Sequence, residues 1–410
     1  MFRIDNDDRL PSSLWGPVLL DKLGLPRYWA NIWSVLNLSV LHASTRTNNL
    51  RHIEALYSFT DDLKGPGFLD DIIAKVQINE IFALLEAFFV SIRNKPVSNN
   101  SEKKWRTALY FLRNTLLLIS KTDANYEKFV EGERKFHYLE TLYDKLHVKK
   151  KSRTNKVRSL PANVVEALFE ITDPSSSQNP FRNEKIKWQV YIIFTILLKQ
   201  GLRRGELLLL PVDAVKSAFD KKSGETRYWL NVNENKYETF DKRYSEPGIK
   251  TENAYRQIPV GKIVALAIQT YVENYRGRTN HSFLINSQLN SPMSNENITK
   301  IFSKLSRCLP KTVIKELKDR TGKESITPHD LRHTSAVVFL SKLLEMGNEM
   351  DEATQKMRVF FGWAPGSSMP LRYAKAVFQD RLSKVWNKIF DNQVDILRSI
   401  PKDFSDDDHK

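Results

Sequence analysis

The sequence lacks several features that mark common classes of protein. Its 410 residues include one cysteine, Cys308, so we expect neither an internal disulfide nor a thiolate zinc cluster. No apolar run reaches the roughly eighteen residues of a membrane span, and residues 1–8 lack the basic and apolar order of a signal peptide. We therefore expect a cytoplasmic protein with no membrane segment.

Motifs for nucleotides and metals are also missing. The chain has no Walker loop, no GxGxxG glycine pattern and no HExxH zinc motif, so we expect no cofactor and no catalytic metal. Acidic residues are the minority among the charged ones, because 63 Lys and Arg outweigh 48 Asp and Glu and give a net charge of +15. Clustered cations displace counterions from a phosphate backbone, and nucleic acid is therefore the expected partner.

Residues 1–147 are predicted to form an all-helical module. Apolar residues recur at spacings of three and four in 101–120, and 72–92 is a second apolar helical stretch. The first of these helices carries basic residues off its apolar stripe: Lys103, Lys104 and Arg106. The segment from Arg46 to Phe59 has a similar basic face. Such faces either lie against DNA or are ordinary solvated surfaces.

A basic segment at 148–160 is predicted to link this module to a second domain. It has no acidic side chain, and its basic residues are Lys149, Lys150, Lys151, Arg153, Lys156 and Arg158. Each cation near a phosphate adds a salt-sensitive increment of affinity, so we expect DNA contacts here. A solvated linker without such contacts is the alternative.

Residues 161–390 are predicted to form a mainly α domain with a small β-hairpin sheet, an α+β fold, followed by a tail at 391–410. The periodicity predicts helices first, then two strands, then more helices. The expected ranges are helices 163–171 and 184–199, strands 228–232 and 255–260, and helices 262–276, 295–307 and 328–346. Gly201 ends the second helix.

Two short strings could each bind a phosphate. In Gly201-Leu202-Arg203-Arg204-Gly205-Glu206-Leu207, an arginine beyond a glycine stop can direct its guanidinium at two phosphate oxygens. The alternative is a surface pair between Arg203 or Arg204 and Glu206.

In Thr327-Pro328-His329-Asp330-Leu331-Arg332-His333, Thr327 is the expected N-cap and Pro328 the first helical residue. His329 and Arg332 then share one face at a helix N-terminus, which favours anions. Asp330 and His333 are expected to support the same network. A chance HxxR string is the alternative.

Two further strings lie closer to the C-terminus. Phe360-Phe361-Gly362-Trp363 offers an indole N–H that could bind a phosphate oxygen, although most tryptophans are core residues. Leu371-Arg372-Tyr373-Ala374 follows, and Tyr373 heads an amphipathic helix. A phenol is a poor nucleophile at its usual pKa of about 10, so it needs cationic neighbours.

In this order and spacing, the strings resemble the tyrosine recombinase family, which includes phage-type integrases, transposon recombinases and chromosome-dimer resolvases. The resemblance makes Arg203 and Arg332 catalytic arginines, Glu206 a structural acid, and His329 the histidine of the His-x-x-Arg box. It places Trp363 where histidine is commoner and makes Tyr373 the nucleophile. It also assigns the catalytic lysine of the hairpin to Lys250, with Lys236 and Lys242 nearby.

The resemblance implies DNA cleavage and rejoining through a 3′-phosphotyrosyl link, without ATP or metal. Residues 1–147 would be a core-binding domain that forms a clamp around duplex DNA with the catalytic domain. It further implies sites with inverted-repeat arms, a dimer on each site and a tetramer in synapsis, with an accessory recombinase or a DNA-bending factor as a further partner. The helix after Tyr373 packs either on a neighbouring protomer or on its own core.

The chain departs from the family pattern in two intervals. The distance from Arg332 to Trp363 is long, and the stretch before Tyr373 contains Ala364-Pro365-Gly366 and Pro370, which predicts a re-routed loop. Two other functions fit parts of the pattern: a type IB topoisomerase, and a DNA-binding protein that has lost catalysis.

Overall fold

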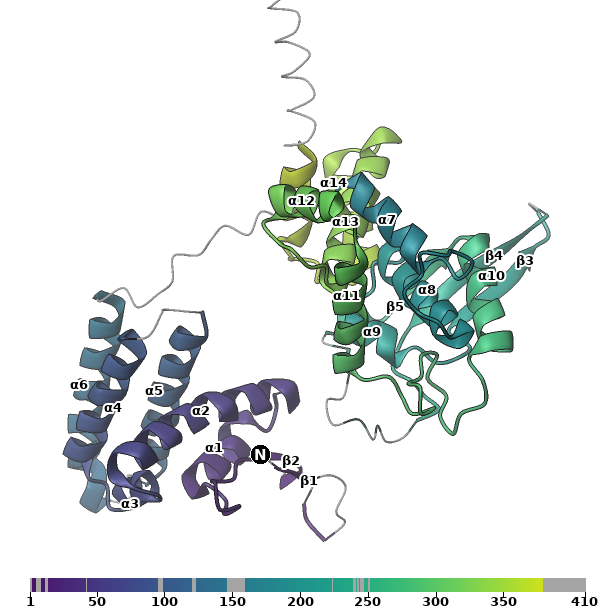
Figure 1. The fold of residues 1–410 in the computed structure, drawn as a ribbon. Coiled ribbons are helices and arrows are strands. Elements are labelled where there is room, and N and C mark those ends of the chain that lie inside the picture. The colour runs from purple at the N-terminus through teal and green to yellow at the C-terminus, as the bar shows by residue number, and fades with distance from the viewer. Residues whose placement is uncertain are drawn as a thin grey trace, which may run out of the picture. The chain divides into compact units, whose positions relative to one another are not determined.

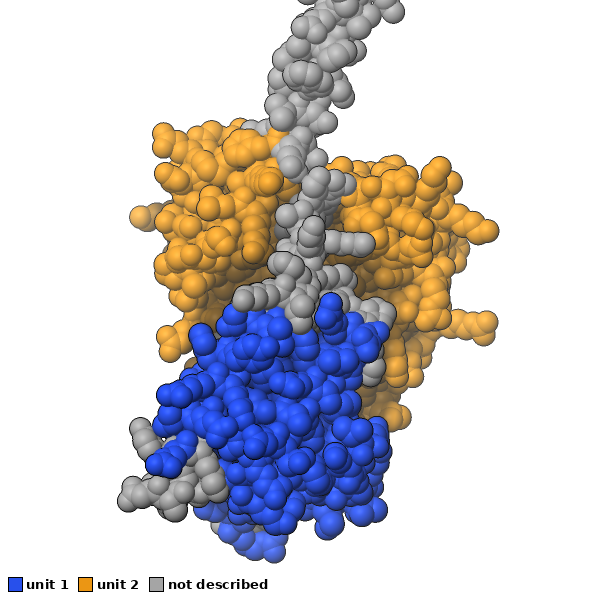
Figure 2. Space-filling view, turned by 90° about the vertical axis from the view of Figure 1, so that its left-hand side faces the viewer, with its two compact units in different colours: residues 1–154 blue, residues 155–410 orange. Residues whose placement is uncertain are grey.

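The fold comes from a computed structural model, which describes residues 2–4, 9–11, 14–41, 43–94, 99–119, 123–145, 159–222, 224–238, 241, 243, 247–249 and 251–378. The chain divides into two compact units, Met1–Thr154 and Asn155–Lys410 (Figure 2). Each unit has its own apolar core. No helix of the described residues is long and apolar enough to cross a membrane.

The first unit is built from helices around one core (Figure 1). The helices are α1 (Tyr28–Leu38), α2 (Ala43–Lys64), α3 (Phe68–Ala74), α4 (Ile78–Arg93), α5 (Asn99–Ile119) and α6 (Asp123–Lys145). The predicted apolar stripe of α5 faces inward, because Trp105, Leu112 and Leu116 are buried. Helices α4, α5 and α6 pack against one another.

Two predictions for this unit are wrong in detail. It is not all-helical, because β1 (Phe2–Ile4) pairs antiparallel with β2 (Gly16–Val18). The apolar stretch at 72–92 is also not one helix, because the chain breaks between α3 and α4 at Val76, whose φ is +49°. A β-branched residue rarely adopts this left-handed conformation, so the surrounding fold must impose it.

The second unit starts with α7 (Ala162–Thr172) and α8 (Glu184–Lys199), and α8 is buried around most of its circumference. The short helix α9 (Arg204–Leu209) then leads to the antiparallel sheet β3 (Val215–Asp220), β4 (Glu225–Val232) and β5 (Arg256–Val260). The predicted two-stranded hairpin therefore has a third strand. Alternate residues Leu230, Val232 and Ile258 point into the core, as the period of two requires.

The rest of the unit is helical: α10 (Lys262–Thr270), a π-helical turn (Tyr271–Tyr275), α11 (Asn295–Cys308), α12 (Lys311–Thr321), α13 (Pro328–Glu345), α14 (Met350–Phe361) and a final helical stretch at 369–378. Helix α13 packs against both α8 and α14 (Figure 1). This packing brings the end of α8, the start of α13 and the end of α14 to one place.

Candidate active site

The first arginine of the site lies between the end of α8 and the start of α9. The chain turns at Gly201 with φ of +58°, and Arg203 is the N-cap residue of α9. A Cβ atom at Gly201 would lie 2.4 Å from Cε1 of Phe361, so only glycine fits this close approach. The turn thereby holds the Arg203 segment against the end of α14.

Glu206 is the hub of a buried charge cluster. It is 2% exposed, and its Oε1 accepts a hydrogen bond from Nη1 of Arg203 at 2.6 Å. Its Oε2 accepts from Nη2 of Arg256 at 2.9 Å and lies 3.8 Å from Nη1 of Arg332. Burial alone would raise the pKa of the Glu206 carboxyl, but the charges of these arginines lower it below its ordinary value. The pair between Arg203 and Glu206 is therefore formed, but it is buried rather than on the surface.

Arg332 projects from the first turn of α13 into the interior. Thr327 is the N-cap residue and Pro328 the first helical residue, as predicted. The Arg332 guanidinium is 2% exposed, and it donates to the carbonyl oxygens of Gly201 at 2.5 Å and Phe361 at 2.7 Å. Burial lowers its pKa to about 9, so it stays cationic at neutral pH. These two bonds tie the ends of α8 and α14 to α13.

The cluster has a surplus of positive charge. Arg203, Arg256 and Arg332 share the carboxylate of Glu206, and their remaining described partners are backbone carbonyls, such as Gly362 O at 3.5 Å from Nη2 of Arg203. Arg203 is only half-buried. Carbonyl dipoles hold a guanidinium without cancelling its charge, so the cluster favours an anion such as a phosphate.

Tyr373 is fully buried beside this cluster. Its ring stacks on the Trp363 indole at 5.4 Å between centroids with 11° between planes, and Trp363 stacks in turn on Phe361. Burial raises the pKa of the phenol to about 12, although Arg332 and Arg203 act in the opposite direction. Residues 369–378 are helical, so Tyr373 lies inside this helix and not at its head as predicted.

Two neighbouring histidines lie on α13, and one of them contacts the phenol. His329 is exposed at the start of the helix, and its ring lies 4.1 Å from that of His333. Nδ1 of His333 lies 2.7 Å from the hydroxyl of Tyr373. Desolvation and the charge of Arg332 lower the pKa of His329, while burial and His329 lower that of His333 to about 4. Both imidazoles are therefore neutral at pH 7.

Asp330 anchors the start of α13. Its carboxylate accepts hydrogen bonds from the backbone N–H and the hydroxyl of Thr327, at 2.9 Å and 2.6 Å. It also pairs with Lys323 at 2.5 Å. These contacts fix the first turn and so orient His329 and Arg332, three positions apart.

The remaining basic residues named from the sequence fall into two groups. Lys250, Lys242 and the linker residues from Lys149 to Arg158 lie outside the described residues. In the first unit, Lys103 and Arg106 are exposed on α5, Lys104 is half-buried, and Arg106 pairs with Glu102 at 3.1 Å. The expectation of a free basic face around Arg46 is wrong for that residue, because Arg46 is buried and donates to the carbonyl oxygen of Trp15.

Arg256 is a member of the site that the sequence argument missed. It lies on β5, is buried, and donates to Glu206, to Phe360 O at 2.8 Å and to Ala254 O at 2.7 Å. The available signal was a basic residue at an inward-pointing position of a strand whose other inward positions are apolar. Such a buried cation needs a buried carboxylate as its partner.

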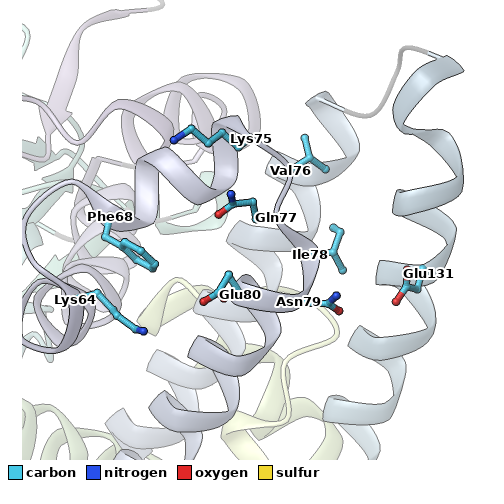
Figure 3. Close-up of a pocket in the computed structure, with 9 residues that line it drawn as sticks. All are labelled: Lys64, Phe68, Lys75, Val76, Gln77, Ile78, Asn79, Glu80 and Glu131. Atoms are coloured by element: carbon cyan, nitrogen blue, oxygen red, sulfur yellow. The ribbon is translucent and has the colours of Figure 1, made fainter.

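A hollow of about 680 Å³ lies in the first unit (Figure 3). Lys64 and Phe68 line it on one side, and Glu131 approaches it from α6. Its charges are mixed, and it contains none of the residues of the arginine cluster. In the described part of the chain, no group of His, Cys, Asp or Glu side chains could hold a metal ion.

Comparison with known proteins agrees with this geometry. The model of the phage integrase family matches residues 158–379, which is more than half of the chain. No curated protein matches the sequence.

Among solved structures, XerH recombinase bound to difH substrate before cleavage has 12% identity and a TM-score of 0.50, over 87% of this chain and 84% of that one. XerA recombinase has 15% identity and a TM-score of 0.35, over 83% of this chain and 98% of that one. At this identity, the XerH likeness concerns the fold alone. The family match covers all the strings that form the site, and the chain belongs to the phage integrase family, as a tyrosine recombinase.

Proposed function

We propose that this protein cuts and rejoins DNA at specific sites through a covalent 3′-phosphotyrosyl link to Tyr373. One observation carries the proposal: Arg203, Arg332, Trp363 and Tyr373, which span 170 positions of sequence, meet around the ends of α8 and α14. The arginine cluster has more positive than negative charge and so suits the phosphate that is cut.

In this mechanism Arg203 and Arg332 bind the non-bridging oxygens of the scissile phosphate and stabilise the charge that builds up there. Tyr373 attacks phosphorus, Lys250 protonates the leaving 5′ oxygen, and His329 assists proton transfer. Trp363 donates its indole N–H to a phosphate oxygen. Because a phosphodiester is exchanged for a phosphotyrosine ester of similar energy, a 5′-hydroxyl can reverse the step without ATP.

The proposed partner is duplex DNA with inverted-repeat arms. The net charge of +15 favours binding to a phosphate backbone. The exposed Lys103 and Arg106 of α5 offer contacts in the first unit. We expect further contacts from the linker residues from Lys149 to Arg158. The XerH structure with the same fold is bound to its difH substrate. We propose that the chain acts as a dimer on each site and as a tetramer in synapsis.

Covalent capture tests the proposal. A DNA site is selected from a random duplex library with the full-length protein, and a nicked version of it traps the cleaved intermediate. Tyr373→Phe should bind this site and form no covalent complex. The matched control is Tyr255→Phe, an exposed tyrosine in the same unit, which should be captured like the unmodified protein. Capture by Tyr373→Phe would place the nucleophile elsewhere.

The same assay separates two other functions. Relaxation of supercoiled plasmids that lack the selected site, without strand exchange, would indicate a type IB topoisomerase. Binding to the site without any capture by the unmodified protein would indicate a DNA-binding protein without catalysis. Strand exchange between two selected sites supports a recombinase.

A further inference from the structure

The phenol of Tyr373 is held by His333 and not by the histidine of the His-x-x-Arg box. Nδ1 of His333 lies 2.7 Å from the Tyr373 hydroxyl, which is within the range for proton transfer. Among the described residues, this is the hydrogen bond that the phenol makes. His329 is four positions earlier on α13 and is exposed.

The direction of this hydrogen bond depends on the tautomer of His333. Burial and the neighbouring His329 keep the pKa of His333 low, and burial keeps the phenol of Tyr373 protonated. A neutral imidazole carries one hydrogen, and with that hydrogen on Nε2 it accepts the phenol proton at Nδ1.

The surroundings leave the phenol little freedom. Trp363 covers one face of its ring, and the rings of His333 and Tyr373 lie 5.7 Å apart at 49°. Stacking on Trp363 therefore holds the ring while the hydroxyl contacts the imidazole. Arg332, which precedes His333 on α13, lies close enough for its charge to act on the phenol.

We propose that His333 is a further catalytic residue, which takes the proton of the Tyr373 phenol through Nδ1 during attack and returns it during rejoining. The inference rests on the proposed function of Tyr373 as nucleophile. In cleavage, the bond from the Tyr373 oxygen to phosphorus forms and the bond from phosphorus to the 5′ oxygen breaks. The phenol proton moves to His333, and the 5′ oxygen takes a proton from Lys250, with His329 assisting this transfer.

The proton moves during bond formation and not before it. A buried phenol with a raised pKa does not ionise in the free enzyme, but its proton becomes acidic as its oxygen bonds to phosphorus. The new imidazolium is then close to the phosphate oxygens, whose negative charge stabilises it. His333 thus acts on the nucleophile, while Lys250 and His329 act on the leaving group.

Substrates that differ in the leaving group separate the two roles. Full-length His333→Asn, His333→Gln and His329→Asn are compared on the selected nicked duplex and on the same duplex with sulfur in place of the scissile 5′ oxygen. A thiolate leaves without taking a proton. Sulfur at this position should therefore restore the capture rate of a variant that lacks the general acid, but not that of a variant that lacks the general base. Asparagine retains an acceptor near the position of Nδ1 but cannot take a proton.

We expect His333→Asn to slow capture by about 10²–10³-fold on both substrates. His329→Asn should be slow on the oxygen substrate and recover on sulfur. Incorporation of 3-fluorotyrosine at position 373, a more acidic phenol, should reduce the deficit of His333→Asn. Capture by His333→Asn at the unmodified rate, or its recovery on sulfur, would overturn the assignment of His333 while leaving Tyr373 as the nucleophile.

A measurement without DNA guards against misfolded variants. Nitrogen-15 NMR of histidine in the unmodified protein should show Nδ1 of His333 unprotonated and Nε2 protonated, and Tyr373→Phe should shift the Nδ1 resonance. A protonated Nδ1 at pH 7 would contradict the inference whatever the variants do. Failure of the unmodified protein to capture any DNA would instead overturn the proposed function.

Discussion

Two buried arginines, one in each unit, are surrounded by opposite charge balances. Arg27 in the first unit is 3% exposed and contacts two carboxylates, Asp61 at 2.5 Å and Glu54 at 3.6 Å. Burial lowers the pKa of Arg27, but the hydrogen bond to Asp61 and the charge of Glu54 outweigh it and raise the pKa. Arg332 in the second unit is equally buried, but it shares one carboxylate with two other arginines and has a lowered pKa.

The contrast teaches how to distinguish a structural cation from one that suits the binding of an anion. Both are buried and well bonded, so burial alone does not separate them. Around Arg27 the negative charges exceed the positive one, and nothing is left to attract an anion. Around Arg332 the positive charges exceed the negative one, which suits the phosphate of the proposed function.

The largest expected effect is on stability in the first unit. Arg27→Met leaves two carboxylates without their cation, and we expect it to lower the free energy of unfolding by about 3–5 kcal/mol. Arg113→Met is the control, because its pair with Glu133 is largely exposed and should contribute less than about 1 kcal/mol. Urea unfolding measures both. Equal losses would remove the distinction between buried and exposed pairs.

Activity should respond to Arg332 instead. Arg332→Ala removes a cation aimed at the charge of the transition state, and we expect covalent capture to slow by about 10²–10³-fold. The neighbouring Arg204 bonds Thr299 at 2.9 Å and takes no part in the cluster, so Arg204→Ala should stay within a few-fold of the unmodified rate. Unchanged capture by Arg332→Ala would show that the charge surplus is not used in catalysis.

Mild acid should destabilise the second unit. The folded-state pKa of His333 is about 4, below the unfolded value of about 6.5, so the unfolded chain binds the proton first as the pH falls. Stability is thus complete above about pH 6.5 and decreases toward pH 4, by about 2 kcal/mol after allowance for partial exposure. His333→Gln should flatten this dependence in hydrogen exchange of α13. An equally steep dependence in that variant would assign it to other groups.

The smallest effect concerns the indole. Trp363→Phe retains an aromatic ring between Phe361 and Tyr373 but loses the N–H donor. We expect capture to slow by about tenfold, the equivalent of one hydrogen bond to a charged group, with little change in unfolding. A loss as large as that of Arg332→Ala would indicate that Trp363 acts by packing Tyr373.

Local patterns in the sequence were sufficient for helices such as α8 and α13 and for the members of the site that lie in strings. Helix α8 runs over the predicted 184–199, and α13 begins at the predicted Pro328. Such elements have long periods and clear end signals. Strands β1 and β2 are three residues each, too short for a period, and Val76 breaks a stretch whose apolar pattern continues through it.

Contacts between distant segments could not be predicted in the same way. The hydrogen bond of His333 to Tyr373 spans 40 positions, and the pair of Arg256 with Glu206 spans 50. Within its own segment each of these residues is ordinary: His333 lies inside a helix, and Arg256 lies on a strand. Only the packing of α13 and β5 around the ends of α8 and α14 brings them together.

The row of parallel rings at the site also provides an optical probe. Trp363 lies between Phe361 and Tyr373, whose rings are nearly parallel to its own, so its electronic transitions couple to theirs. Any displacement of the phenol removes one of those neighbours and alters the near-ultraviolet circular dichroism of the indole. The circular dichroism of Trp363 would therefore report whether Tyr373 keeps its stacked position when DNA binds.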